Sequence, residues 1–164
     1  DSWMKTSARI VTRPAKVKPG QSIPMTGMAQ VGISGLTKVQ YSLSPQESEW
    51  PKDDPWFTKA DWKDADVLPA PENWGGGLPD GKLPAGTIGI DSTSGKPVSW
   101  PMRYSLVHWG TLIPGLAAGK YNLRCRTIDA NGIAQPLPRP FLKSGGNAIQ
   151  TLPLTVDDST AANL

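Results

Sequence analysis

Hydrophobic and polar residues alternate along several stretches of this chain, most clearly between 121 and 126. The apolar positions there are Tyr121, Leu123 and Cys125, and the polar positions are Asn122, Arg124 and Arg126. Successive side chains of a β-strand point to opposite faces, so this pattern predicts a strand with one buried face. A turn is expected at 129–132, because Asp can bond its own backbone and Asn and Gly tolerate positive φ.

Similar patterns predict five further strands. The segments are Ala8 to Arg13, Ile23 to Val31, Lys38 to Leu43, Met102 to Trp109 and Ala148 to Val156. Within the last, Pro153 cannot donate to a ladder, which predicts a sheet edge or a bulge. The small inward residues Gly27 and Ala29 predict the close approach of a bulky side chain such as a tryptophan. A turn is expected at 112–115, which contains Pro and Gly.

The alternation of hydrophobic and polar residues is lost between Trp50 and Trp100. We expect a short strand near 56–60, a helical turn at 61–66 and an irregular insertion over about 62–100. A segment this long without regular structure usually marks a functional loop or an insertion. The Gly75 to Gly77 run lacks the Lys-Ser/Thr and the preceding strand of a phosphate-binding loop, so we interpret it as a flexible bend.

Composition agrees with a β-rich domain. The chain has 164 residues and a mass of 17.6 kDa, enough for one domain with a core, and its 17 Gly and 17 Pro favour turns over helices. We therefore predict an all-β fold of two packed antiparallel sheets over 1–158, followed by a polar tail at 159–164.

Charge and hydropathy argue against two classes of partner. The net charge is +3, but Lys and Arg are scattered, so the sequence lacks the basic patch of a nucleic-acid-binding protein. It also lacks an apolar run of membrane-spanning length, and from the residues at its start we expect no signal peptide. Because it opens at Asp1 without Met, we expect an excised fragment or a processed protein.

The single cysteine, Cys125, cannot form an internal disulfide. With only His108 as a further soft ligand, it cannot build a structural zinc site. Its inward position in an alternating strand predicts a small core residue. The alternative is a thiolate ligand or nucleophile, which would need a nearby base or cation that its own strand does not supply on that face.

Several motifs together resemble the C-terminal dimerisation domain of the sulfite oxidase family of molybdenum enzymes. They are IVTRP, GMAQVG, KVQYSL, Trp109 with Pro114 beyond it, AAGKYNLRCRTIDANGIAQP and GGNAIQTLPLTV. They follow one another in the family's order and cover most of the chain outside about 62–100. The tract from Gly119 to Gln135 is the most specific.

The resemblance implies an immunoglobulin-like β-sandwich that joins two subunits. In that family the molybdopterin cofactor and the cysteine ligand of molybdenum belong to a preceding catalytic domain, so the expected partners are that upstream domain and a second copy. This chain itself is then expected to hold no cofactor and no catalytic residue. Bacterial relatives imply a periplasmic or exported location.

Family members often carry a Trp-Asn pair before a Gly near the last strand, and some place there a basic residue that reaches toward the anion-binding active site. This chain departs from that pattern, because it has Phe141-Leu142-Lys143-Ser144-Gly145 at this place. Lys143, or Arg139 beside it, therefore only approximates the basic position. A solvated surface charge is the alternative interpretation for both.

Seven tryptophans are many for this length, and most fall in or beside the irregular stretch. We take Trp100, Trp109 and Phe141 as candidates for a subunit interface, where aromatic residues are favoured. The loop tryptophans are also suited to stacking on sugar rings or to covering open sheet edges. His108 has no carboxylate near it in the sequence, so a surface position on a strand fits it better than a catalytic base. The acidic clusters near 53–66 lack the pattern of a calcium loop.

Two functions of different class remain open. One is a non-catalytic dimerisation domain of a sulfite oxidase-like molybdenum oxidoreductase. The other is an immunoglobulin-like module that binds carbohydrate or protein through its Trp-rich loops. A free-standing enzyme comes third, because the chain has one His, one Cys and no nucleophile motif.

Overall fold

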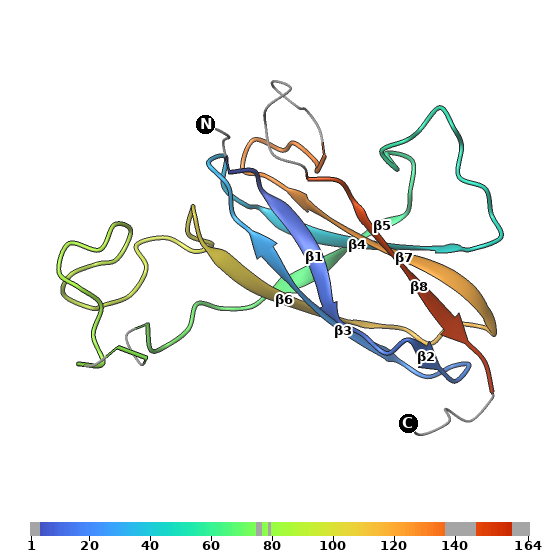
Figure 1. Cartoon of the computed structure of the whole chain (residues 1–164), viewed down its shortest axis with the longest axis horizontal. Helices are drawn as coiled ribbons and strands as arrows, with labels where there is room; N and C mark the ends of the chain where they lie inside the picture. Colours follow the sequence, from blue (N-terminus) through green and yellow to red (C-terminus); the bar gives the residue numbers. More distant parts are fainter. Residues whose placement is uncertain (1–3, 75–76, 79, 137–146, 159–164) are drawn as a thin grey trace.

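A computed structural model describes residues 4–74, 77–78, 80–136 and 147–158 (Figure 1). Within these residues the fold is all-β, as predicted, and contains no helix and hence no helix that could cross a membrane. The strands are β1 (Ser7–Thr12), β2 (Lys16–Val17), β3 (Ile23–Gln30), β4 (Lys38–Pro45), β5 (Trp62–Val67), β6 (Leu106–Ile113), β7 (Gly119–Ile128) and β8 (Gln150–Val156).

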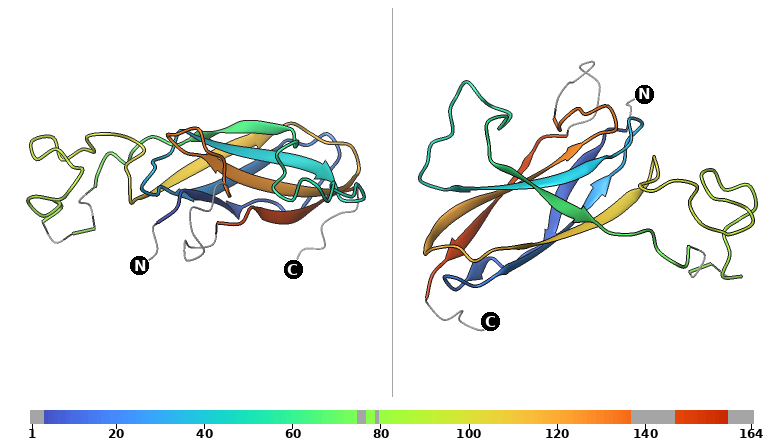
Figure 2. Two further views of the ribbon diagram at one scale, coloured as in Figure 1. Left: turned by 90° about the horizontal axis from the view of Figure 1, so that it is seen from above. Right: turned by 180° about the vertical axis from the view of Figure 1, so that it is seen from behind.

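The eight strands form one curled sheet in the order β1-β3-β6-β5-β4-β7-β8-β2. Neighbouring strands are antiparallel except β2 and β8, which run parallel, so the sheet is mixed rather than purely antiparallel. The curl brings β1 against β7 and β8. Seen from above in Figure 2, the strands accordingly lie in two layers. The core fills the space between these layers.

The predicted alternation decides which residues fill that core. The largest fully buried side chains include Trp109, Ile23, Met25, Ile113, Leu123, Leu154 and Cys125. Gly27 lies opposite Trp109 in the β3–β6 pair. A Cβ at position 27 would overlap both the Trp109 ring and the Arg9 carbonyl oxygen. The predicted approach of a tryptophan to this glycine is confirmed.

Two glutamine side chains link the free edge of β1 to the other end of the sheet. The amide of Ala8 donates to Gln135 Oε1 at 2.9 Å, and the amide of Ile10 donates to Gln150 Oε1 at 2.7 Å. Gln135 is itself buried and donates through Nε2 to the Asn147 carbonyl at 2.9 Å. Backbone donors that an edge strand would leave unpaired are thus satisfied inside the fold.

Four local predictions for the middle of the chain are wrong. Residues 62–67 form β5, which pairs with β4 and β6, so the irregular segment starts after this strand and 61–66 is no helical turn. Residues 56–60 form turns instead of a strand. β6 continues through Leu112 and Ile113, because both pair with β3, and the chain leaves the sheet only at Pro114.

The predicted turn at 129–132 and the predicted sheet-edge position of Pro153 are confirmed. Asp129 Oδ1 accepts hydrogen bonds from the amides of Asn131 and Ile133, both at 2.9 Å, and Gly132 has a φ of 79°. In β8 the amide of Thr155 donates to the Ala15 carbonyl at the β2 edge. Backbone nitrogens two residues apart face the same edge, and β2 does not extend alongside position 153. Pro153 therefore faces an open edge.

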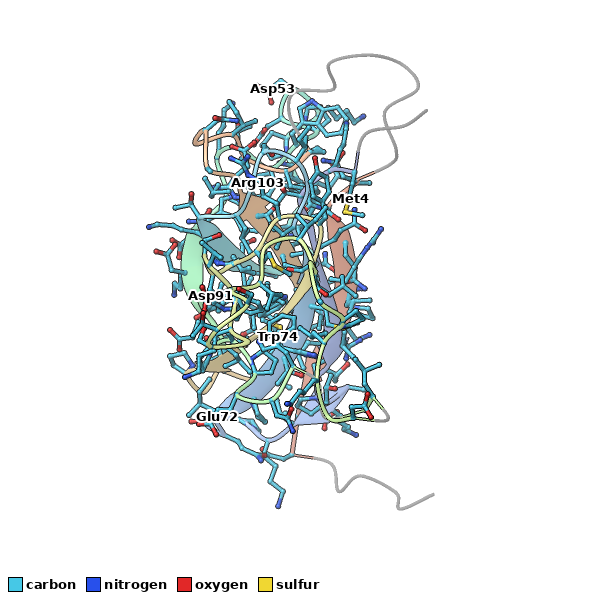
Figure 3. All side chains as sticks on the ribbon, turned by 90° about the vertical axis from the view of Figure 1, so that its left-hand side faces the viewer. Met4, Asp53, Glu72, Trp74, Asp91 and Arg103 are labelled. Atoms are coloured by element: carbon cyan, nitrogen blue, oxygen red, sulfur yellow. The ribbon has the colours of Figure 1, made fainter. Side chains whose placement is uncertain are left out.

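The segment between β5 and β6 extends away from the sheet at one end of the molecule (Figure 1). Figure 3 looks at the molecule from that end, with Trp74 and Asp91 in front of the strands. Trp100 anchors the returning chain, because its Nε1 donates to the Leu68 carbonyl at 2.9 Å. The Trp74 ring meets Trp100 edge-on, with ring centroids 5.7 Å apart.

Candidate interaction surfaces

The structure separates the three residues predicted at a subunit interface. Trp109 has 0% of its surface exposed and packs in the core, so this residue offers no area to a partner. Trp100 is half-buried at the base of the long segment and keeps some free surface. Phe141 lies outside the described residues, as do the two candidate basic residues, Lys143 and Arg139.

Cys125 is a core residue. It lies opposite Tyr41 in the β4–β7 pair and has no exposed surface. Burial raises the pKa of its thiol to about 12, against smaller opposing effects of the Ile10 backbone and the Arg9 charge. The thiol is therefore protonated at neutral pH and unsuited to act as a nucleophile or metal ligand.

His108 lies on the solvent side of β6, opposite Met28 of β3. The part of the chain that the structure describes contains no group of three or more His, Cys, Asp or Glu side chains placed to hold a metal ion. The surfaces that remain as candidates are therefore faces of the sheet and one loop hollow.

The outer face of β1, β3 and β6 exposes large aliphatic side chains. Leu106 and Leu112 of β6 are 59% and 65% exposed, and Val11 of β1 is 58% exposed. Pro24 is paired with Leu112 and is also exposed. We call Val11, Pro24, Leu106 and Leu112 the aliphatic face. It is the outward counterpart of the buried Val107, Trp109 and Ile113 on the same strand.

The outer face of β4 and β7 carries two arginines instead. Arg124 is 5% exposed and donates through Nη1 to Ser44 Oγ at 2.8 Å. Arg126 is half-buried and donates through Nε to Gln40 Oε1 at 2.9 Å. The two side chains are two residues apart on β7, which separates their Cα atoms by about 7 Å.

Aromatic rings from the β4–β5 loop and from β5 lie against both guanidinium groups. Phe57 lies 4.2 Å and Trp50 5.9 Å from the Arg124 guanidinium carbon, measured to the ring centroids. Trp62 lies 4.2 Å from that of Arg126. We call Arg124, Arg126 and these three rings the arginine–aromatic cluster. Such cation–π contacts contribute about 0.5–2 kcal/mol each, depending on desolvation.

Asp54 fixes the loop that carries two of these rings. Its buried carboxylate accepts hydrogen bonds from the amides of Thr58 at 2.8 Å and Lys59 at 2.9 Å. Burial tends to raise the pKa of Asp54, but these and further hydrogen bonds outweigh it, so that the pKa lies below its usual value. The carbonyl of Asp54 also accepts the Trp50 indole N–H at 2.8 Å. Asp54 therefore stabilises the loop that contains it.

A second acid, Asp64 of β5, lies beside the arginine–aromatic cluster. It accepts from Lys38 Nζ at 2.7 Å and from Gln40 Nε2 at 2.8 Å. The hydrogen bonds from Lys38 and then Gln40 hold the pKa of Asp64 below its usual value. Its charge is thus matched by a lysine and not by either arginine.

Burial lowers the pKa values of Arg124 and Arg126, and no carboxylate of the described residues acts against that effect. Both guanidinium groups nevertheless remain cations at any physiological pH. The sequence alternation placed both side chains on the polar face of their strand, but it did not identify this cluster, because the rings come from elsewhere in the chain. The sequence did contain one sign of the cluster. The two arginines of the predicted β7 strand lie beside Gln40, Ser42 and Ser44 of β4, and none of these three residues is an acid.

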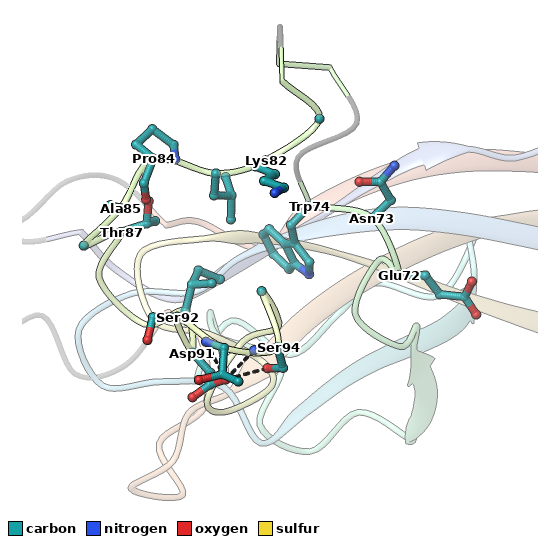
Figure 4. A pocket seen from close by; sticks show the side chains of 16 residues that line it. Glu72, Asn73, Trp74, Lys82, Pro84, Ala85, Thr87, Asp91, Ser92 and Ser94 are labelled. Carbon is teal, nitrogen blue, oxygen red and sulfur yellow. Dashed lines mark hydrogen bonds between the residues drawn. The ribbon is translucent and has the colours of Figure 1, made fainter.

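A hollow of about 540 Å³ lies within the long segment between β5 and β6 (Figure 4). Its walls come from loop residues, among them Trp74, Lys82, Pro84 and Asp91. The Asp91 carboxylate accepts from the Ser94 amide at 2.7 Å and from Ser94 Oγ at 2.8 Å, and these bonds lower its pKa. Asp91, one of the two acids that line this hollow, therefore stabilises its own turn.

Comparison with known proteins adds little to this description. No family model matches the sequence, and no curated protein matches it. Among solved structures, one similar chain is AvmM, which catalyses macrocyclization in alchivemycin A biosynthesis. It has 12% sequence identity and a TM-score of 0.40, over 96% of this chain and 91% of that one. Similarity at this level carries no argument about function.

Proposed function

We propose that this chain is a non-catalytic, immunoglobulin-like β-sandwich module that pairs two copies of a sulfite oxidase-like molybdenum oxidoreductase. The catalytic domain, with its molybdopterin cofactor, would lie upstream in the parent protein, at a periplasmic or exported location. Support comes from the motif resemblance along most of the chain and from a curled sheet whose ends pack in two layers. The sandwich assignment is part of the proposal.

The aliphatic face is the observation that carries self-association. Leu106 and Leu112 alternate with core residues on a single strand, yet more than half of each side chain is exposed. Val11 of β1 and Pro24 of β3 add to the same sheet face, and exposed aliphatic residues on one face suit a surface that another protein covers. A two-fold contact centred there would need to bury on the order of 1,500 Å² in the intact enzyme.

The residues of this chain do not fit a molybdenum site of their own. Cys125, the only cysteine, is buried and protonated at neutral pH, so it does not supply the thiolate that the family's metal requires. The proposed role is therefore to hold catalytic domains together. The cofactor would belong entirely to the upstream domain.

Sedimentation equilibrium over a wide concentration range tests the proposal. Leu106→Arg and Leu112→Arg place a charge on the aliphatic face and should each weaken the dimer about tenfold or more, because burying an unpaired charge is costly. Ile88→Arg is the matched control, since Ile88 is 93% exposed on the distant loop and should leave association unchanged. The parent protein should contain molybdenum and the isolated chain none.

A wild-type chain that remains monomeric at every concentration would contradict self-association through this face, as would face variants that associate as tightly as wild type. A parent protein without molybdenum would contradict the family assignment separately.

Binding of carbohydrate through the Trp-rich loops receives less support. A sugar stacks on an open ring face, but Trp50 and Trp62 lie over arginines and Trp74 meets Trp100 edge-on. Trp56, which is 41% exposed, offers an isolated surface.

A further inference from the structure

Arg124 and Arg126 form a pair of cations that the described chain does not neutralise. The four salt bridges of the described residues are made by Lys16, Lys38, Lys59 and Lys63. Neither arginine has a carboxylate partner there, and each makes one hydrogen bond, to a neutral side chain. A buried or half-buried charge is normally paired, but these two guanidinium groups have no counter-charge of their own among the described residues.

The cluster holds Arg126 ready for such a partner. Trp62 supports its guanidinium plane at 4.2 Å, and Gln40 fixes the Nε–H. Both Nη groups have no hydrogen-bond partner among the described residues, and these groups form one edge of the planar fork. A guanidinium fixed in this way loses little entropy on binding and matches the two oxygens of a carboxylate.

Arg124 adds a second, deeper charge. Its Nε is buried without a hydrogen-bond partner, and so is Oγ of Ser42, the residue opposite Arg124 in the β4–β7 pair. Neither of the acids beside the cluster serves these groups, because Asp64 binds Lys38 and Gln40 while Asp54 binds its own loop. Both guanidinium charges are therefore left without an acidic partner in the part of the chain that the structure describes.

We propose that Arg126, backed by Arg124, receives an acidic side chain from a protein partner. The ligand class follows from the fork of Arg126 and from the surrounding Trp62, Trp50 and Phe57, since aromatic residues with arginine are enriched in protein interfaces. The site lies over β4, β5 and β7, away from the aliphatic face of β1, β3 and β6, and it does not depend on the proposed self-association.

An NMR titration of the whole chain with acetyl-Ser-Glu-Ser-amide tests the proposal. The probe carries one carboxylate, because Arg124 is 5% exposed beneath its rings and Arg126 is the more open of the two arginines. We expect saturable shifts of the Arg126 Nε–Hε and Trp62 indole resonances, and none with acetyl-Ser-Gln-Ser-amide. Arg126→Gln should weaken binding about tenfold or more, whereas Arg126→Lys keeps the charge and loses the fork, so it should weaken binding less.

Arg103→Gln is the control for total charge, because Arg103 is exposed outside the cluster and its loss should leave the titration unchanged. Thermal unfolding of each variant confirms that it is folded, and Arg126→Lys serves if Arg126→Gln is not. Sodium sulfate binding more tightly than the Glu peptide would overturn the proposal in favour of a free-oxyanion site. Absence of saturable shifts, or equal binding by Arg126→Gln and wild type, would show that the arginines only pack against the aromatic rings and do not bind a partner.

Discussion

At the scale of single residues, Gly27 controls the packing of the largest core side chain. Its missing Cβ is the space in which the Trp109 ring and the Arg9 carbonyl lie. Gly27→Ala must displace either a fully buried ring or a strand backbone, so we expect it to lower the free energy of unfolding by about 1–3 kcal/mol or more. Urea denaturation followed by tryptophan fluorescence measures this loss.

Gly110 provides the matched control for that substitution. It lies on the neighbouring strand β6, paired with Thr26, and a Cβ there would meet its nearest atom, the Met25 carbonyl oxygen, at an ordinary 3.7 Å. Gly110→Ala should therefore change stability by a few tenths of a kcal/mol. Equal losses in the two variants would show that the contact with Trp109 is not what requires glycine at position 27.

Cys125 predicts a specific loss of stability at alkaline pH. Its thiol has a pKa of about 12 in the folded chain, against a usual value of 9.0. Between these two values the unfolded chain releases this proton and the folded chain retains it, so the free energy of unfolding falls as pH rises above about 9. Below pH 9 both states are protonated and this contribution is fully present.

Comparison with Cys125→Ala isolates this effect from lysine and tyrosine titration, which both proteins share. The variant should be less stable at neutral pH, because it leaves a cavity, but it should lose less stability between pH 9 and 11. Urea unfolding at several pH values measures the difference. Parallel curves for the two proteins would contradict the buried, protonated thiol.

At the scale of elements, alternation predicted the strands whose inward residues are apolar. β3, β4 and β7 follow this rule, and their predicted inward residues are buried except Leu43 and Tyr121, which are half-buried. β5 escaped prediction because its first two residues break the alternation. Ala65 and Val67 face inward between exposed Asp64 and Asp66, but the exposed Lys63 shares their side of the strand and Trp62 points outward against Arg126. A strand that packs its aromatic residue on the outer face lacks the periodicity that identifies a half-buried strand.

The arginine–aromatic cluster was hidden from the sequence for a related reason. Arg126 on β7 touches Gln40 on β4 and Trp62 on β5, and these contacts span many residues along the chain. Alternation shows on which face a side chain lies but not which strand pairs beside it. The glutamine links of β1 are likewise set by the curl of the whole sheet, because Gln135 and Gln150 reach Ala8 and Ile10 from its other end.

At the scale of the whole molecule, the long segment between β5 and β6 is separate from the packing that defines the fold. The cluster of buried core residues contains none of the described residues from 68–105, and Trp100 is half-buried against it. Leu68 and Trp100 close the base of the segment through the Trp100 indole N–H. The aliphatic face and the arginine–aromatic cluster both lie outside it, on strands and on the β4–β5 loop. The segment is therefore an addition to a complete sheet.

Replacing 72–97 by about ten Gly and Ser residues should accordingly preserve the fold, because this linker is long enough to span the base and loop closure depends weakly on length. The variant keeps Leu68 and Trp100 but loses the edge contact with Trp74, so we expect cooperative unfolding with a stability within about 1–2 kcal/mol of wild type. Self-association and the Glu-peptide titration should be unchanged. Non-cooperative unfolding would show that the segment is part of the core, and lost association alone would place the dimer contact on the segment rather than on the aliphatic face.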